Sequence, residues 1–424
     1  MHNKTNSLDK YDGYIIVLGF IVNSFWILLI RTQPLSDFLY YHELAQQIAN
    51  GGQWGDTYTT VGYSVILGFF YKIFGAKIEI AKGLNLILSV INSLLVLGIL
   101  TRMALSKGIR KAVLVLFVLF PMNIYYNSIL AVEILFTTLL LLIIYLYLSD
   151  TQYKYWIIGI LTGINTMIKP FFIIFFLVIF LTEWITNKKF LNSLMKGLVV
   201  LGMTILIISP WLYRNYKLVG EFTYVSNNGG IVLYINNNSQ NKQGGWMPAA
   251  EVENSLINLP EYQLANPTQQ NKMLTFTAKQ WIKTHPKEFL ALGMKRLGLT
   301  YSSKGDIDYS FYGTKISQPL KSSLISASEY IRGAIFYLGI SSIIAFSGLT
   351  IWRKMSHSTR SLELRSNQND VFFLLIFYMF TGVYFITEGQ SRYAFPIIFI
   401  IIYYFFMALE YLVNRMNSLS KIDV

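Results

Sequence analysis

Long apolar runs separated by short polar segments make up most of this chain. Each run approaches the roughly 20 residues that an α-helix needs to cross a bilayer. A helix satisfies its own backbone hydrogen bonds in lipid, whereas an open strand does not. The pattern therefore predicts an all-α, polytopic membrane protein with about ten spans. The expected spans are residues 12–31, 79–101, 112–128, 130–148, 155–169, 171–186, 197–213, 331–352, 371–387 and 393–413.

The basic residues predict which loops face the cytoplasm. Short loops alternate between rich and poor in Lys and Arg, and the rich loops are expected inside. Both termini are then cytoplasmic. Residues 58–75 are apolar enough to be an eleventh span, but counting them would move Arg102, Lys107, Arg110 and Lys111 outside. We therefore expect 58–75 to form a juxtamembrane or re-entrant helix on the outer face.

A second juxtamembrane helix is expected at 38–50, inside the first outer loop, 32–78. Leu44, Ala45 and Ile48 fall on one face of this helix, as in helices that lie along a membrane surface. The first outer loop is thus expected to be helical and pinned to the membrane.

The chain is expected to have three parts. Residues 1–213 form a seven-span module, and residues 331–424 return to the membrane. Between them, 214–330 form an outer segment that is too long for a simple connector, and such loops are usually functional or partly folded. Helices are expected within it near 268–284 and 286–300.

Composition narrows the classes of function. Only 13% of the residues are charged, against about 25% in soluble domains, so the formal charge of +13 reflects topology and lipid contacts rather than nucleic acid. The absence of Cys excludes disulfides, thiolate catalysis and Cys-ligated zinc. The first apolar run has no small-residue cleavage site, so it is expected to stay as an anchor. Abundant Asn and Lys indicate an AT-rich bacterium, and hence a bacterial cytoplasmic membrane.

No stretch matches a P-loop, a Rossmann fingerprint or a His-rich metal motif. This favours a lipid-linked sugar donor over a nucleotide sugar. Transfer from a lipid phosphate needs a carboxylate to accept the proton of the attacking hydroxyl. It also needs cationic groups, or a divalent metal ion, to stabilise the departing phosphate.

Asp37 is the candidate base, because it sits in the first outer loop beside the membrane. The alternative is that Ser36 or Asp37 caps the helix that follows. His42 and Glu43 come next, either as exposed residues of that helix or as contributors to an acceptor or metal site.

Glu133 opens the otherwise apolar fourth span, and an acid at that depth is a functional candidate by default. The alternative is a headgroup position that favours the helix N-terminus.

Lys169 precedes Pro170, and it lies either in a tight outer turn or beside a phosphate. Arg392 stands on the outer side against the charge bias, so it needs a partner, either a lipid phosphate or Glu388. Tyr393, next to it, is otherwise an interface anchor. Arg214 is a similar cation on the expected outer side. It is a weaker candidate for a phosphate contact because a long loop begins there.

Several different short motifs follow one another along the chain, and their order is informative. The first outer loop carries an acid, Asp37, followed by Tyr40 or Tyr41 and a helix that ends at Gly51, and Tyr63 follows Gly62. The later motifs are Glu133 at the start of a span, Lys169-Pro170, Pro210-Trp211-Leu212-Tyr213-Arg214-Asn215, and Arg392-Tyr393 with Pro396. In this set and order the chain resembles the GT-C glycosyltransferases of the protein O-mannosyltransferase and aminoarabinose-transferase type. It departs from them by lacking an Asp-Glu pair in the first loop and the prolines before Tyr63.

The resemblance implies a GT-C fold and inverting transfer of a sugar from a polyprenyl-phosphate donor. Asp37 would be the base, and Glu133 a second acidic site with Glu43 and His42. The donor phosphate would meet Arg392, Lys169 and Arg214.

Four tyrosines, Tyr40, Tyr41, Tyr63 and Tyr393, would line the donor and acceptor pocket. The bacterial donor would be an undecaprenyl-phosphate hexose or pentose, and the acceptor a wall polymer, lipid or protein on the extracytoplasmic face. The residues that bind a metal in some relatives have no clear match, so the resemblance leaves a divalent metal open. A flippase or transporter for a lipid-linked sugar, and an oligosaccharide polymerase or ligase, are the alternatives from the residues.

Overall fold

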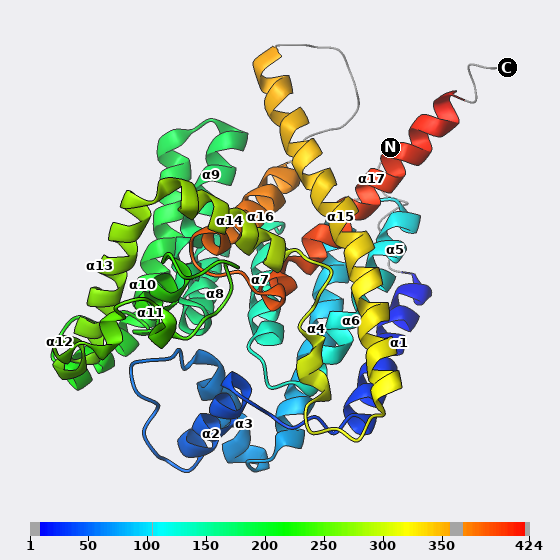
Figure 1. Ribbon diagram of the computed structural model, residues 1–424. Coiled ribbons are helices and arrows are strands. Elements are labelled where there is room, and N and C mark those ends of the chain that lie inside the picture. The colour runs from blue at the N-terminus through cyan, green and yellow to red at the C-terminus, as the bar shows by residue number, and fades with distance from the viewer. Residues whose placement is uncertain (1–8, 104, 357–367, 420–424) are drawn as a thin grey trace.

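The computed structural model describes residues 9–103, 105–356 and 368–419, and every regular element in these ranges is helical. The predicted all-α class is therefore confirmed (Figure 1). Each of the ten expected spans overlaps a helix. These are α1 (Lys10–Leu29), α4 (Ile78–Arg102), α5 (Lys107–Val118) with α6 (Pro121–Tyr125), α7 (Glu133–Tyr147), α8 (Lys154–Ile168), α9 (Phe175–Asn187), α10 (Phe190–Val219), α15 (Gln318–Ser356), α16 (Gln368–Ile386) and α17 (Ile398–Leu419).

Fewer helices are long enough to cross a membrane than the sequence led us to expect. Within the described residues, seven helices are long and apolar enough to cross a membrane, and eight if the pair that bends by 46° at Pro121 counts as one. The count of about ten is thus not confirmed, although the chain is a multi-pass membrane protein. Proline explains part of the difference. Proline lacks a backbone N–H and disfavours a helical residue before it. Accordingly α5 ends at Val118, shortly before Pro121, and α8 ends at Ile168, shortly before the 3₁₀ helix η2 (Pro170–Ile174).

The first outer loop contains the two helices expected from the sequence, α2 (Asp37–Ala49) and α3 (Gly62–Phe74). The 13 residues of α3 extend about 20 Å, which is short of the roughly 30 Å of a bilayer core. The two helices pack closely, because Gly68 has no side chain to hold them apart: a Cβ there would lie 3.0 Å from the Ala45 carbonyl oxygen. Figure 1 shows both at one end of the molecule, with the end of α17 at the other.

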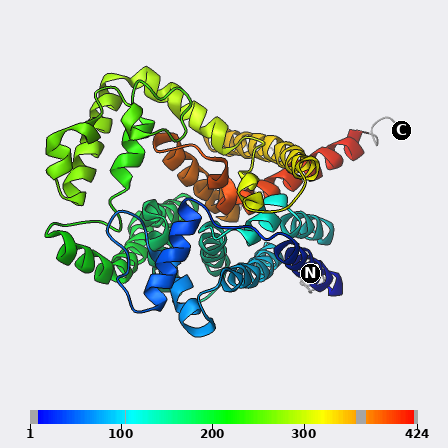
Figure 2. The same cartoon turned by 60° about the horizontal axis from the view of Figure 1, so that its bottom comes forward.

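The outer segment is more helical than its Asn-rich start indicates. It contains α11 (Gly229–Asn236), α12 (Pro260–Leu264), α13 (Pro267–Thr284) and α14 (Pro286–Thr300). The last two match the helices expected there. Figure 2 shows α13 and α14 arching along one side of the molecule toward α15, and α14 packs on α16.

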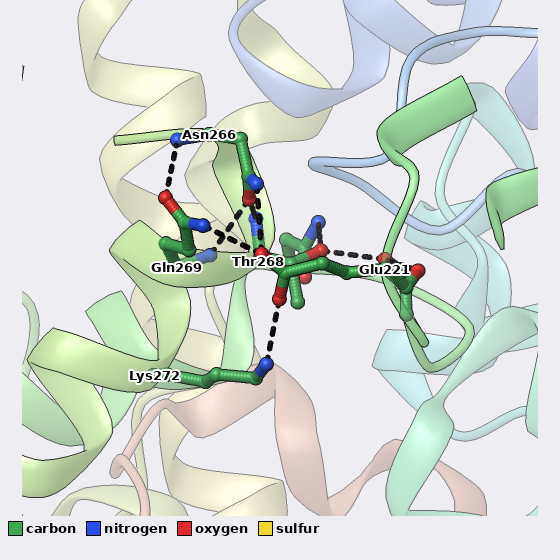
Figure 3. Close-up of polar contacts among 7 residues, drawn as sticks. Glu221, Asn266, Thr268, Gln269 and Lys272 are labelled. Carbon is green, nitrogen blue, oxygen red and sulfur yellow. Dashed lines mark hydrogen bonds and ion pairs between the residues drawn. The ribbon is translucent and has the colours of Figure 1, made fainter. Parts of the chain in front are cut away.

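One acidic residue ties this outer segment back to the end of α10. The Glu221 carboxylate accepts hydrogen bonds from Asn266 (3.0 Å) and Gln269 (2.6 Å) and forms an ion pair with Lys272 (2.7 Å) (Figure 3). These donors lower the pKa of Glu221 from its ordinary 4.5 to about 2. Asn266 is also the N-cap residue of α13, so the same side chain caps the helix and donates a hydrogen bond to Glu221.

Two fully buried arginines fix the chain between α16 and α17. Arg296, on α14, donates to the carbonyl oxygens of Phe385 (2.7 Å) and Ile386 (3.1 Å) at the end of α16. Arg332, on α15, donates to the carbonyl oxygen of Ser391 (3.0 Å). Helix C-terminal carbonyls carry partial negative charge, so cations suit this position. The outer segment and α15 thereby hold the short stretch that leads into α17.

Candidate active site

Asp37 lies at the first position of α2 and faces away from its own helix. The preceding Ser36 adopts a positive φ of 49°, and its side chain makes no capping hydrogen bond. The Asp37 carboxylate instead meets Arg392, with Oδ2 3.0 Å from Nη2. Its side chain remains 53% exposed, so a water-borne hydroxyl group can reach it.

Arg392 belongs to η6 (Ser391–Ile397), the 3₁₀ turn that precedes α17. Its Nε donates to Gln390 Oε1 (2.7 Å), and its backbone N–H donates to Asp306 Oδ2 (2.9 Å). The guanidinium also lies 5.6 Å from the centre of the Phe38 ring. These contacts fix the position of the guanidinium, and its Nη1 has no hydrogen-bond partner among the described residues.

A second ion pair lies deeper. Glu133 opens α7 and is 2% exposed, and its Oε1 is 3.5 Å from Lys169 Nζ, which is 13% exposed. Its other oxygen, Oε2, is buried and has no hydrogen-bond partner among the described residues. Lys169 is the C-cap residue of α8, just before Pro170, and its ammonium lies 4.9 Å from the centre of the Tyr393 ring. This pair therefore retains hydrogen-bonding capacity that the protein itself does not use.

The two ion pairs form one site. Arg392 interacts electrostatically with Glu133 as well as with Asp37, and Lys169 interacts with Asp37 and Arg392 as well as with Glu133. The four side chains come from α2, from α7, from the turn after α8 and from η6. Two cations thus face an exposed carboxylate on one side and a buried carboxylate on the other.

Three of the four predicted tyrosines surround these charges. The rings of Tyr41 and Tyr63 meet edge to face at 5.7 Å, and Tyr393 donates to Glu388 Oε2 (2.7 Å). Burial, together with the negative charge of Asp37, raises the pKa of Tyr41, so its hydroxyl stays protonated at neutral pH. The Tyr63 hydroxyl is buried and has no hydrogen-bond partner among the described residues.

Four predicted site residues lie outside this cluster. Arg214 donates to the carbonyl oxygens of Trp54, Gly55 and Asp56, so it anchors the loop between α2 and α3. The other three lie on α2: the Tyr40 hydroxyl accepts from Thr59 (2.8 Å), His42 Nδ1 is 2.6 Å from the Tyr71 hydroxyl at the interface with α3, and Glu43 is exposed.

Two residues of the site, Asp306 and Gln390, had no functional signal in the sequence. Asp306 reaches Arg392 from a loop 86 positions earlier, and it adopts a left-handed φ of 51°. Gln390 bridges Arg392 to Glu388, donating to Glu388 Oε1 (3.0 Å). The sequence suggested a lipid phosphate or Glu388 as the partner of Arg392. In the structure Glu388 accepts from Tyr393 and Gln390, and Arg392 forms its ion pair with Asp37.

Metal-ligating side chains do not gather here. No three Asp, Glu, His or Cys residues of the described ranges are close enough to hold a metal ion together. The cationic groups that this site itself supplies are Arg392 and Lys169.

Two solved structures share this arrangement of helices over nearly the whole chain. An oligosaccharyltransferase, AglB, from Archaeoglobus fulgidus, in complex with an inhibitory peptide and a dolichol-phosphate, aligns over 97% of this chain with a TM-score of 0.51 and 12% identity. The oligosaccharyltransferase of the same organism tethered to an acceptor peptide aligns over 96% with a TM-score of 0.50 and 14% identity. The chain therefore has a GT-C fold.

This GT-C chain spans about half the length of those archaeal proteins, 51% and 50% respectively. A third structure, ArnT from Cupriavidus metallidurans bound to undecaprenyl phosphate, aligns over 94% of this chain and 78% of its own, with a TM-score of 0.38 and 10% identity. No protein-family model and no curated protein sequence matches the chain. The identities are low throughout, so the likeness concerns the fold.

Proposed function

We propose that this protein is a membrane glycosyltransferase that moves a sugar from a polyprenyl-phosphate donor to a hydroxyl group of an envelope acceptor. The observation that carries the proposal is the exposed Asp37 carboxylate, held 3.0 Å from Arg392 beside the Lys169–Glu133 pair in a GT-C fold. A half-exposed carboxylate next to two cations is the minimum that the reaction needs.

The proposed step is an inverting displacement. Asp37 accepts the proton of the acceptor hydroxyl, whose oxygen forms a bond to the anomeric carbon. The bond from that carbon to the phosphate oxygen breaks, and the phosphate leaves with the electron pair. Arg392, through Nη1, and Lys169 stabilise the charge on the departing phosphate.

Glu133 and the tyrosines have supporting roles in this proposal. The buried Glu133 pairs with Lys169 at 3.5 Å and so fixes the position of its ammonium group, and its unused Oε2 can accept a hydrogen bond from a sugar hydroxyl. Tyr41, Tyr63 and Tyr393 supply hydroxyls and ring faces for the sugar. Arg214 and Tyr40 act indirectly, by shaping the loop beside Asp37.

The donor and the location follow from the sequence rather than from the site. We propose undecaprenyl phosphate as the bacterial lipid carrier, a cytoplasmic membrane with both termini inside, and an active site on the outer face. The acceptor is a wall polymer, a lipid or a protein.

The experiment compares membranes that carry the wild type, Asp37→Asn or the control Asp308→Asn. Asp308 is an exposed carboxylate near the site that makes no contact with the cluster. Each membrane receives a panel of labelled undecaprenyl-phosphate hexoses and pentoses, and donor consumption and label transfer are followed. We expect the wild type and the control to consume one donor, and Asp37→Asn to lose about 10²–10⁴-fold in rate while still binding it.

Other results would redirect or end the proposal. An active Asp37→Asn variant would remove Asp37 as the base. A donor that crosses vesicles without being consumed would indicate a transporter. A ladder of products or the transfer of a whole block would indicate a polymerase or a ligase.

A further inference from the structure

A buried carboxylate, Glu388, lies in the short segment between α16 and η6. Only 4% of Glu388 is exposed, and no Lys or Arg of the described residues forms an ion pair with it. Arg296 interacts with it electrostatically, but the Arg296 guanidinium donates to carbonyl oxygens at the end of α16 instead. Burying a carboxylate without an ion-pair partner costs free energy, so a neutral side chain would suit this position better unless the charge has a use.

Both oxygens of Glu388 accept hydrogen bonds from neighbours of the proposed phosphate site. Oε1 accepts from Gln390 Nε2 (3.0 Å), and Oε2 accepts from the Tyr393 hydroxyl (2.7 Å). Gln390 Oε1 in turn accepts from Arg392 Nε (2.7 Å). A continuous chain of hydrogen bonds therefore joins the Glu388 carboxylate to the Arg392 guanidinium.

This chain of hydrogen bonds has only one possible direction. An ionised carboxylate can only accept hydrogen bonds, and a guanidinium can only donate them. The Gln390 amide between them must therefore turn its NH₂ toward Glu388 and its oxygen toward Arg392. Because Nε is fixed in this way, the guanidinium plane is fixed too, with Nη2 3.0 Å from Asp37 Oδ2.

The backbone of this segment is held in place without Glu388. The Gly389 N–H donates to the Gly244 carbonyl oxygen (3.1 Å), and Arg332 donates to the Ser391 carbonyl oxygen (3.0 Å). These contacts come from the outer segment and from α15. The path of the chain between α16 and η6 therefore does not depend on the Glu388 side chain.

We propose that Glu388 is a positioning residue for Arg392. Its charge sets the orientation of the Gln390 amide, and that amide sets the plane of the guanidinium, so that Nη2 meets Asp37 and Nη1 is presented to the donor phosphate. Glu388 itself does not touch the substrate. This inference rests on the proposed sugar transfer, in which Arg392 meets that phosphate.

The test is the affinity of the full chain, in neutral detergent, for undecaprenyl phosphate and for undecaprenol, which has the same alkyl chain without the phosphate. We expect Glu388→Gln to weaken binding of undecaprenyl phosphate about fivefold to tenfold, comparable to the loss of one hydrogen bond, and to leave binding of undecaprenol unchanged. Glu288→Gln, which removes an exposed acid of α14, is the matched control and should bind both lipids like the wild type. Equal affinity of the wild type and Glu388→Gln for undecaprenyl phosphate would overturn the inference.

Double variants show whether Glu388 acts through its two neighbours. Gln390→Ala should weaken undecaprenyl phosphate binding as much as Glu388→Gln does, and the two changes together should be no worse than Gln390→Ala alone. In an Arg392→Met background, Glu388→Gln should change the affinity by less than about twofold. Effects that simply add would show that Glu388 acts by another route and would refute the positioning role.

Thermal stability separates positioning from a structural role. Glu388→Gln keeps the size of the side chain and removes a desolvated charge, so its melting temperature should equal or exceed that of the wild type. A lower melting temperature with weaker binding of both lipids would make Glu388 structural. A wild type that binds undecaprenyl phosphate no better than undecaprenol would end the proposed function and this inference together, whereas unchanged binding by Glu388→Gln would end the inference alone.

Discussion

Asp37 and Arg392 are 355 positions apart in the sequence, and their side chains form an ion pair of 3.0 Å between the first outer loop and the turn that begins α17. The pair closes the site by joining its first and last elements. In the proposed mechanism the pair would place the base beside the cation that meets the phosphate, so that proton transfer and departure of the leaving group would be assisted from one point.

The guanidinium geometry of Arg392 should matter more than its charge. Arg392 uses Nε for Gln390 and Nη2 for Asp37, which a lysine ammonium cannot reproduce together. We expect Arg392→Lys to lower the rate of transfer by about 100-fold, measured by label transfer from the donor that the wild type consumes. Arg31→Lys, which changes an exposed arginine just after α1, is the control. A rate within twofold of wild type would show that charge alone suffices.

The contribution of the Glu133–Lys169 pair to stability should be separable from its contribution to sugar transfer. Lys169→Met leaves the buried Glu133 without its partner, and removing one member of a buried pair costs about 3–5 kcal/mol. We expect this variant to melt at a lower temperature than the wild type. The double variant Glu133→Gln/Lys169→Met should recover most of that melting temperature and none of the transfer. Recovery of both would reduce the pair to a structural role.

The helices were predictable because their signal is local. A run of about 20 apolar residues rarely forms anything other than a membrane-spanning helix. The helices α13 and α14 begin at Pro267 and Pro286, and proline suits the first helical position. What the sequence did not predict is where prolines shorten a span. The run that contains Pro121 reads as one span by hydropathy, but the helix bends there.

The site was predictable only in part, because its contacts join distant segments. Asp37, Glu133, Lys169 and Arg392 each stood out as a charge in an apolar setting. Asp306 did not, since an acid in a long polar loop has no distinguishing pattern, and its contact is with a backbone N–H. The sequence also singled out His42, whose Nδ1 lies 2.6 Å from the Tyr71 hydroxyl on α3. Its part in an acceptor or metal site stays a prediction.

Arg214 should act through the loop and not through the phosphate. Its guanidinium donates to three consecutive carbonyl groups, those of Trp54, Gly55 and Asp56, and stacks on the Trp211 ring at 4.3 Å. Arg214→Ala should speed amide hydrogen exchange in this loop and lower transfer by about tenfold, less than Arg392→Lys.

The matched control for Arg214 is Lys217→Ala, which removes an exposed cation one turn further along α10. It should leave both the exchange rate and the transfer rate unchanged. If Arg214→Ala impaired donor binding without any change in loop exchange, Arg214 would contact the phosphate after all.

The tie between Glu221 and α13 should fail at low pH. The folded-state pKa of Glu221 is lowered to about 2, against an ordinary 4.5, because Lys272, Asn266 and Gln269 donate to the carboxylate. A depressed pKa means that the tie contributes its full stability above about pH 4.5 and loses it as the pH falls through about 2. Cleavage by an acid protease near the start of α13, corrected with an unfolded standard, should therefore increase between about pH 4 and about pH 2. Glu221→Gln should be cleaved rapidly at both values, whereas Glu251→Gln, which removes an exposed acid outside the tie, should follow the wild type. A Glu221→Gln variant with the same pH profile as the wild type would show that this carboxylate does not hold α13 in place.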